Sequence, residues 1–235
     1  MKAFSLALAT LLLVVVSTRV AAAEEPPCKG CRLALPPASP DGAKVPLLVV
    51  LHGDHQPTAT PHDAWTRLAL KHGIGVLTLA CPADLGCKGS YWQWDGDPSW
   101  VSAQVAKVEA TRQVDRDRLW IAGWSGGATW LGMHAQSFAQ TFAATIIHGG
   151  GLAPRAPGCG DTKASVYFLV GDKNPLHQLA VGLREHYRTC DADLSWDLVR
   201  GADHGGEWAS LASHGAKLVE WLLAHPRAAK DAGAP

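Results

Sequence analysis

The chain has 235 residues, and its 21 basic side chains balance 21 acidic ones. A chain with neither net charge nor a basic stripe has no electrostatic reason to bind nucleic acid or an anionic membrane surface. The length fits one domain with a sizeable core, since single α/β domains often reach this size. We therefore expect one globular domain without a nucleic-acid partner.

The first 23 residues are typical of a secretory signal peptide. A basic start precedes an apolar run over 4–16, and the small residues Ala21–Ala23 are followed by two acids. The run is shorter than the roughly 20 residues that span a bilayer, so cleavage is favoured over a membrane anchor. We expect a secreted or periplasmic chain that begins near Glu24 and has no stable membrane insertion.

All six cysteines lie beyond this leader. They are Cys28, Cys31, Cys81, Cys87, Cys159 and Cys190. An even number in an exported chain predicts disulfides. We expect Cys81 to pair locally with Cys87, and Cys159 to pair with Cys190 over a longer loop. Cys28 and Cys31 have the CxxC spacing of redox and zinc sites, but no second CxxC is present, so a structural disulfide is favoured.

Aliphatic runs alternate with helical stretches after an extended lead-in over 24–44. Strands are expected over 45–51, 74–80, 119–124, 143–148, 165–170 and 194–199. Helices are expected over 62–72, 100–113, 128–140, 176–190 and 206–225. Aliphatic runs without strict alternation suit strands buried on both faces. The pattern therefore predicts an α/β domain over 45–225, with a mostly parallel sheet, helices on both faces and a frayed tail over 226–235.

The loop over 81–99 is long and rich in aromatic residues, including Tyr91, Trp92 and Trp94. Amphipathic rings in a long loop suit an apolar or sugar-bearing ligand. The same rings could instead cover the core from a disulfide-pinned loop. The sequence leaves both interpretations open.

A candidate nucleophile lies at Ser125, within the G-x-S-x-G pattern over 123–127. A predicted strand precedes it and a predicted helix follows it, as a nucleophile elbow requires. Small residues two before and two after the serine let the strained turn close. The hydroxyl then lies at a helix N-terminus, where the helix dipole favours developing negative charge.

Two further segments carry a family resemblance. Residues 51–56 are similar to the oxyanion-loop pattern L-H-G-C-x-Q, with Asp54 in place of the Cys, and 114–118 resembles V-D-x-x-R. The chain resembles the secreted esterase branch of the α/β-hydrolases, which includes polyhydroxyalkanoate depolymerases and feruloyl or acetyl-xylan esterases. The match runs from about Val45 to Trp221. It implies the α/β-hydrolase fold and cleavage of carboxylic esters.

The base is expected at His204. In this superfamily the chain order is Ser, then Asp or Glu, then a His that follows the last strand. His204 follows the strand over 194–199 and precedes the final helix. His214 and His225 lie within or at the end of that helix and are expected to be bystanders, and His177 is a weaker alternative.

The acid departs from the family pattern. G-x-x-D-P would place it where this chain has Asn174, and Asp172 lies two residues earlier. An Asn cannot stabilise an imidazolium as a carboxylate does, and the Asp-to-Asn change in a serine protease costs about 10⁴ in kcat. Asp172 is favoured. Asp203 or Asp197 could substitute, or Asn174 could orient the ring in an impaired triad.

The oxyanion hole is expected from the backbone N–H groups of Gly126 and Asp54. The His-Gly-Gly-Gly run over 148–151 looks like an oxyanion motif, but it follows the nucleophile strand and is expected to be a decoy.

Neither a metal nor a cofactor is expected. The nearby His52, His55 and His62 lack the i, i+4 spacing of a helical zinc site, and no P-loop or G-x-G-x-x-G is present. The sequence thus predicts a secreted serine hydrolase that cleaves polyester, feruloyl or small acyl esters through an acyl-enzyme on Ser125. The alternative is a catalytically impaired binding protein on a hydrolase scaffold.

Overall fold

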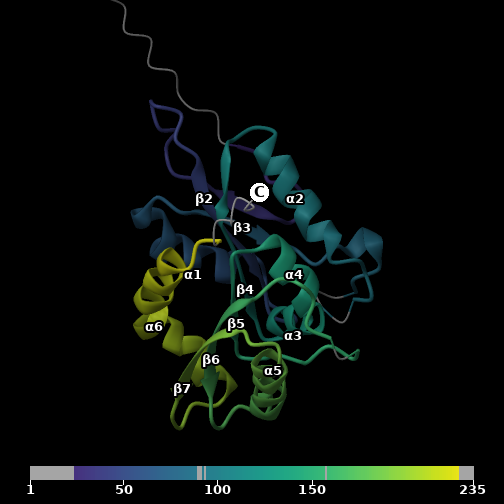
Figure 1. Ribbon diagram of the computed structural model, residues 1–235. Helices are drawn as coiled ribbons and strands as arrows, with labels where there is room; N and C mark the ends of the chain where they lie inside the picture. The colour runs from purple at the N-terminus through teal and green to yellow at the C-terminus, as the bar shows by residue number, and fades with distance from the viewer. Residues whose placement is uncertain (1–23, 89–91, 93, 157, 228–235) are drawn as a thin grey trace, which may run out of the picture.

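A seven-stranded sheet runs through the computed structural model, which describes residues 24–88, 92, 94–156 and 158–227 (Figure 1). The predicted signal peptide over 1–23, Tyr91 and most of the predicted tail lie outside the described residues. The strand order is β1-β3-β2-β4-β5-β6-β7. β1 is antiparallel to β3, and every other neighbouring pair is parallel. The strands are β1 Arg32–Ala34, β2 Val45–Leu51, β3 Gly75–Leu79, β4 Val114–Trp124, β5 Ala144–His148, β6 Ser165–Gly171 and β7 Asp193–Val199.

Helices cover both faces of the sheet. They are α1 Ala59–Ala69, α2 Ser99–Glu109, α3 Gly126–Met133, α4 Ala135–Thr141, α5 His177–Thr189 and α6 His204–Ala224, with short 3-10 turns at Leu70–His72 and Ala83–Leu85. One apolar core joins α1 and α6 to the sheet through Trp65 and Leu218. The other core joins α2 to α5 through residues such as Val105, Trp130 and Leu183 (Figure 1). The predicted α/β class, with a mostly parallel sheet between two helical layers, is confirmed.

Three elements differ from the expectation. β4 begins at Val114, because the segment before the aliphatic run pairs with Val45 across an irregularity in the ladder. β1 lies inside the predicted lead-in and adds an edge strand to the sheet. The helix expected over 128–140 is broken at His134, whose φ of −112° and ψ of 27° are not helical.

The three expected disulfides are present. Cys28 is joined to Cys31, Cys81 to Cys87, and Cys159 to Cys190. None of the cysteines is free. Within the described part of the chain, no helix is long and apolar enough to cross a membrane.

The aromatic loop packs inward. Trp92 is 2% exposed and Trp94 is 8% exposed. Their rings lie 5.3 Å and 5.6 Å from the ring of Trp130, whose Nε1 donates to the carbonyl of Trp94 at 3.0 Å. Trp92 and Trp94 therefore cover the core, and Trp94 also lines a surface pocket together with Met133 and His134.

Candidate active site

Ser125 forms a strained turn between the end of β4 and the start of α3. Its φ is 52° and its ψ is −112°, in a region that L-residues rarely adopt. Its N–H donates to the carbonyl of His148, on the adjacent strand β5, at 2.9 Å. A Cβ on Gly123 would lie 2.6 Å from the amide nitrogen of Ala128, and one on Gly127 would lie 2.7 Å from the carbonyl oxygen of His52. The glycines are thus needed for the turn to close.

His204 reaches Ser125 from the far end of the chain. It is the first residue of α6, and its Nε2 lies 3.0 Å from Oγ of Ser125. The imidazole stacks on the indole of Trp124, with centroids 4.6 Å apart and an interplanar angle of 19°. Burial lowers the pKa of His204, and the charge of Asp203 opposes this. A neutral ring beside a serine hydroxyl is the arrangement that general-base activation requires.

Two of the predicted acid positions hold backbone around the base. Oδ1 of Asp172 accepts from the N–H of Gly201 at 2.6 Å, so it fixes the loop before α6. Oδ1 of Asp203 accepts from the N–H of Gly206 at 2.8 Å and caps the helix. Among the described residues, the structure has no hydrogen bond between Asp172 and the ring of His204, so a role of Asp172 as the acid stays a prediction.

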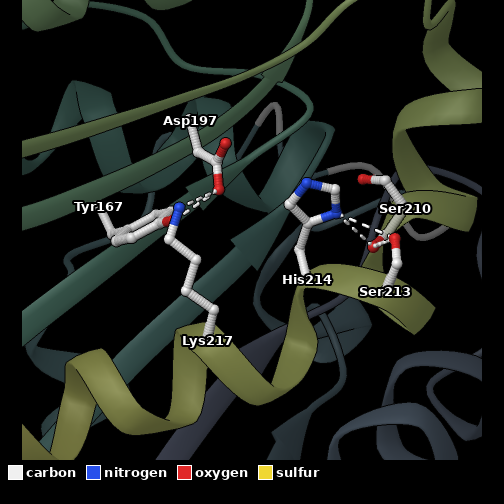
Figure 2. Close-up of polar contacts among 6 residues, drawn as sticks. All are labelled: Tyr167, Asp197, Ser210, Ser213, His214 and Lys217. Atoms are coloured by element: carbon white, nitrogen blue, oxygen red, sulfur yellow. Dashed lines mark hydrogen bonds and ion pairs between the residues drawn. The ribbon is translucent and has the colours of Figure 1, made fainter.

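Asp197 contacts Lys217, which lies in the C-terminal half of α6 and far along the helix from His204. Figure 2 shows its carboxylate accepting from the hydroxyl of Tyr167 at 2.7 Å and from Nζ of Lys217 at 2.9 Å. Burial acts to raise the pKa of Asp197, but these two hydrogen bonds bring it below the ordinary value. His214, one of the predicted bystanders, contacts two serines of its own helix in the same view.

Asn174 meets a residue that sequence reasoning missed. Its Nδ2 donates to Oε2 of Glu207 at 2.6 Å and to the carbonyl of Gly149 at 3.3 Å. Both side chains are buried, Glu207 completely. Nδ1 of His204 is also buried and has no hydrogen-bond partner among the described residues. The sequence did contain a hint of this residue: Glu207 is a carboxylate in the apolar stripe of the final helix, three residues after His204.

The run over 148–151 packs against the turn that holds Ser125. Nε2 of His148 donates to the carbonyl of Glu207 at 2.9 Å. Burial lowers the pKa of His148 to about 4, so the ring is neutral. Its ring lies 4.5 Å from that of Trp124, which in turn lies 5.0 Å from the ring of Trp208. His148 therefore contacts Trp124, which precedes Ser125 in the chain, and Glu207, which lies on the same helix as His204.

The loop after β2 brings Asp54 next to the nucleophile. Its Oδ1 accepts from the N–H of Trp92 at 3.0 Å. A methyl group on Gly126 would overlap this carboxylate. Nε2 of His52 accepts from the N–H of Cys81 at 3.1 Å, which ties the loop to the disulfide segment. The side-chain carboxylate of Asp54 therefore lies beside Gly126. An oxyanion site formed by the backbone N–H groups of these two residues stays a prediction.

A metal site does not emerge from these side chains. Across residues 24–227, leaving aside the few positions outside the description, no group of three His, Cys, Asp or Glu is placed to hold an ion. His62 instead contacts the hydroxyl of Thr78 at 3.1 Å.

Comparison with known proteins gives matches in structure only. No family model matches the sequence, and no curated protein matches it either. A thermostable esterase superposes with a TM-score of 0.62 and 20% identity over 84% of this chain, which spans 59% of the length of that esterase. Esterase PE8 gives 0.61 and 16%, covering 80% of this chain and 97% of the other. Est1E of Butyrivibrio proteoclasticus, with ferulic acid bound, gives 0.56 and 15%, covering 83% and 94%. At these identities the likeness is one of fold.

Proposed function

We propose that this chain, which has the α/β-hydrolase fold of these esterases, is an exported serine hydrolase that cleaves carboxylic esters through an acyl-enzyme on Ser125. One observation carries the proposal. A serine held at positive φ on a strand-to-helix turn lies 3.0 Å from the imidazole of His204. A strained backbone at such a turn marks a functional site when the surrounding structure enforces it.

The reaction follows from this geometry. Nε2 of His204 takes the proton of the Ser125 hydroxyl as the oxygen attacks the acyl carbon, and then protonates the leaving alcohol. Backbone N–H groups of Gly126 and Asp54 stabilise the oxyanion. Water, deprotonated by the same imidazole, releases the acid and restores the serine.

Export and substrate class have separate support. Three disulfides favour an oxidising compartment, because cytosolic thiols are kept reduced. Ferulic acid is the ligand in one of the similar structures, which favours feruloyl or other small acyl esters as first substrates to test. Polyesters belong to the same reaction class.

The test compares wild type with Ser125→Ala on a short-chain nitrophenyl ester. Ser137→Ala is the matched control, because Ser137 is an exposed serine on α4. We expect turnover in wild type and in the control, and a loss of at least about 10³-fold in Ser125→Ala.

A fluorophosphonate probe separates an enzyme from a binding protein on the same scaffold. We expect the probe to label Ser125 stoichiometrically, with no labelling of the Ser125→Ala variant. Wild-type turnover equal to that of Ser125→Ala, together with an unlabelled serine, would establish the impaired binding protein instead.

A further inference from the structure

A carboxylate lies buried one helical turn from the base. Glu207 has 0% of its surface exposed, and its Oε2 accepts from Nδ2 of Asn174 at 2.6 Å. Burial raises the pKa of Glu207, whereas the backbone amides of Gly171 and Gly149 and the side chain of Asn174 act to lower it. A buried carboxylate is costly unless another group uses its charge.

Two buried atoms of α6 lack hydrogen-bond partners within the described residues, and their chemistry is complementary. One is Nδ1 of His204 and the other is Oε1 of Glu207. Because Nε2 of His204 accepts from Ser125 before attack, Nδ1 carries the ring proton and is a donor. Residues three apart on a helix are neighbours on one face. A donor without an acceptor and an acceptor without a donor therefore lie on the same turn of α6, although the two atoms are not within hydrogen-bond distance of each other.

We propose that Glu207 is the positioning carboxylate of this site: a small side-chain adjustment brings Oε1 to the Nδ1 proton of His204 while Asn174 holds Oε2. The inference rests on the proposed function of Ser125 and His204. The carboxylate fixes the tautomer in which Nε2 faces the serine. It also stabilises the imidazolium that forms when the serine attacks.

Asn174 fits this arrangement, and a carboxylate in its place would not. Both of its amide hydrogens are used, by Glu207 and by the carbonyl of Gly149, and its Oδ1 accepts from the N–H of Leu176 at 2.9 Å. An Asp at 174 would place two carboxylates at hydrogen-bond distance, and one of them would have to stay protonated. The Asn at the family's acid position is then the partner of an acid that has moved to α6.

Three variants test the assignment by activity. Glu207→Gln keeps the shape and removes the charge, and we expect kcat to fall by about 10²–10⁴. Glu220→Gln makes the same change at an exposed position of the same helix and is expected to match wild type. The double variant Glu207→Gln/Asn174→Asp returns a carboxylate to the pair, and we expect it to recover at least about tenfold over Glu207→Gln.

An NMR titration of the His204 ring decides the matter independently of turnover. The nearby titratable groups, Asp203 and His148, are retained in these variants. We expect the pKa of His204 to fall by about 1 in Glu207→Gln, because the imidazolium loses its counter-charge, and to stay unchanged in Glu220→Gln.

The outcomes separate the two proposals. Wild type no faster than Ser125→Ala defeats the proposed function, while the ring titration still reports on Glu207. An unchanged His204 pKa in Glu207→Gln overturns the inference. So does a loss of kcat in Asp172→Asn that Glu207→Gln does not share.

Discussion

Gly126→Ala is the most informative single substitution at the elbow. Gly126 is the first residue of α3 and has an ordinary negative φ, so the backbone itself accepts a side chain. In a helix Ala is favoured over Gly by about 1 kcal/mol. Here, however, the new methyl group would overlap the carboxylate of Asp54. The outcome therefore depends on what moving that carboxylate costs.

The magnitude follows from the bond that must break. Displacing Asp54 removes the hydrogen bond from the N–H of Trp92, which is worth about 1.5–3 kcal/mol when one partner is charged and somewhat less at this half-buried position. Overpacking adds about 1–3 kcal/mol. Against the helix gain of about 1 kcal/mol, we expect Gly126→Ala to lower the free energy of unfolding by about 1–4 kcal/mol. Moving the elbow should also slow ester turnover by about 10–100-fold.

Denaturant unfolding and ester turnover measure these effects in a double-mutant cycle. In an Asp54→Ala background the overlap is gone, so Gly126→Ala should become neutral or stabilising, with a coupling of about 1–3 kcal/mol. Gly182→Ala is the control, because a Cβ there meets nothing within 4 Å. The reasoning fails if Gly126→Ala is as harmless as the control, or if its cost is the same with and without Asp54.

Three further predictions concern stability. Burial lowers the pKa of His148 from its ordinary 6.5 to about 4 in the folded protein. As pH decreases, the unfolded chain therefore binds this proton before the folded protein does. The free energy of unfolding then falls between these two pH values, by about 3 kcal/mol in the limit. Equilibrium unfolding of His148→Gln at several pH values should show a shallower acid loss than wild type; equal slopes would contradict the assignment. Replacing Cys159 and Cys190 by Ala opens a link of sequence separation 31, and calorimetry should show a loss of about 3–4 kcal/mol, whereas a change below about 1 kcal/mol would speak against it. Tyr167→Phe removes one donor from Asp197 and should cost about 1 kcal/mol in denaturant unfolding without changing kcat; a changed kcat would place this pair in the active site after all.

Most of the fold was predictable because the buried strands are continuous aliphatic runs. The starts of β2 and β5 were predicted to within one residue for this reason. β1 was missed because Arg32–Ala34 is too short to show a pattern and depends on pairing with β3. The start of β4 was missed because Asp115 and Arg116 look like a loop, and only the ladder to β2 makes them part of a strand.

The pairing of Ser125 with His204 was predictable because each residue is defined by local sequence. Ser125 lies in a motif with the right flanks, and His204 follows the last strand in the expected chain order. Glu207 was not predictable, because its proposed role depends on burial and on Asn174, which lies 33 residues away. Contacts of this kind depend on how α6 packs beside β6, which local spacing does not encode.

The stack of Trp124 on His204 links the face of one aromatic ring to the charge of another. A protonated imidazole over an indole gains a cation–π attraction that a neutral ring lacks, worth about 0.5–2 kcal/mol. In the proposed reaction the imidazole is protonated between attack on the ester and departure of the alcohol. Trp124 then favours the charged state of that ring, although it takes no part in bond breaking.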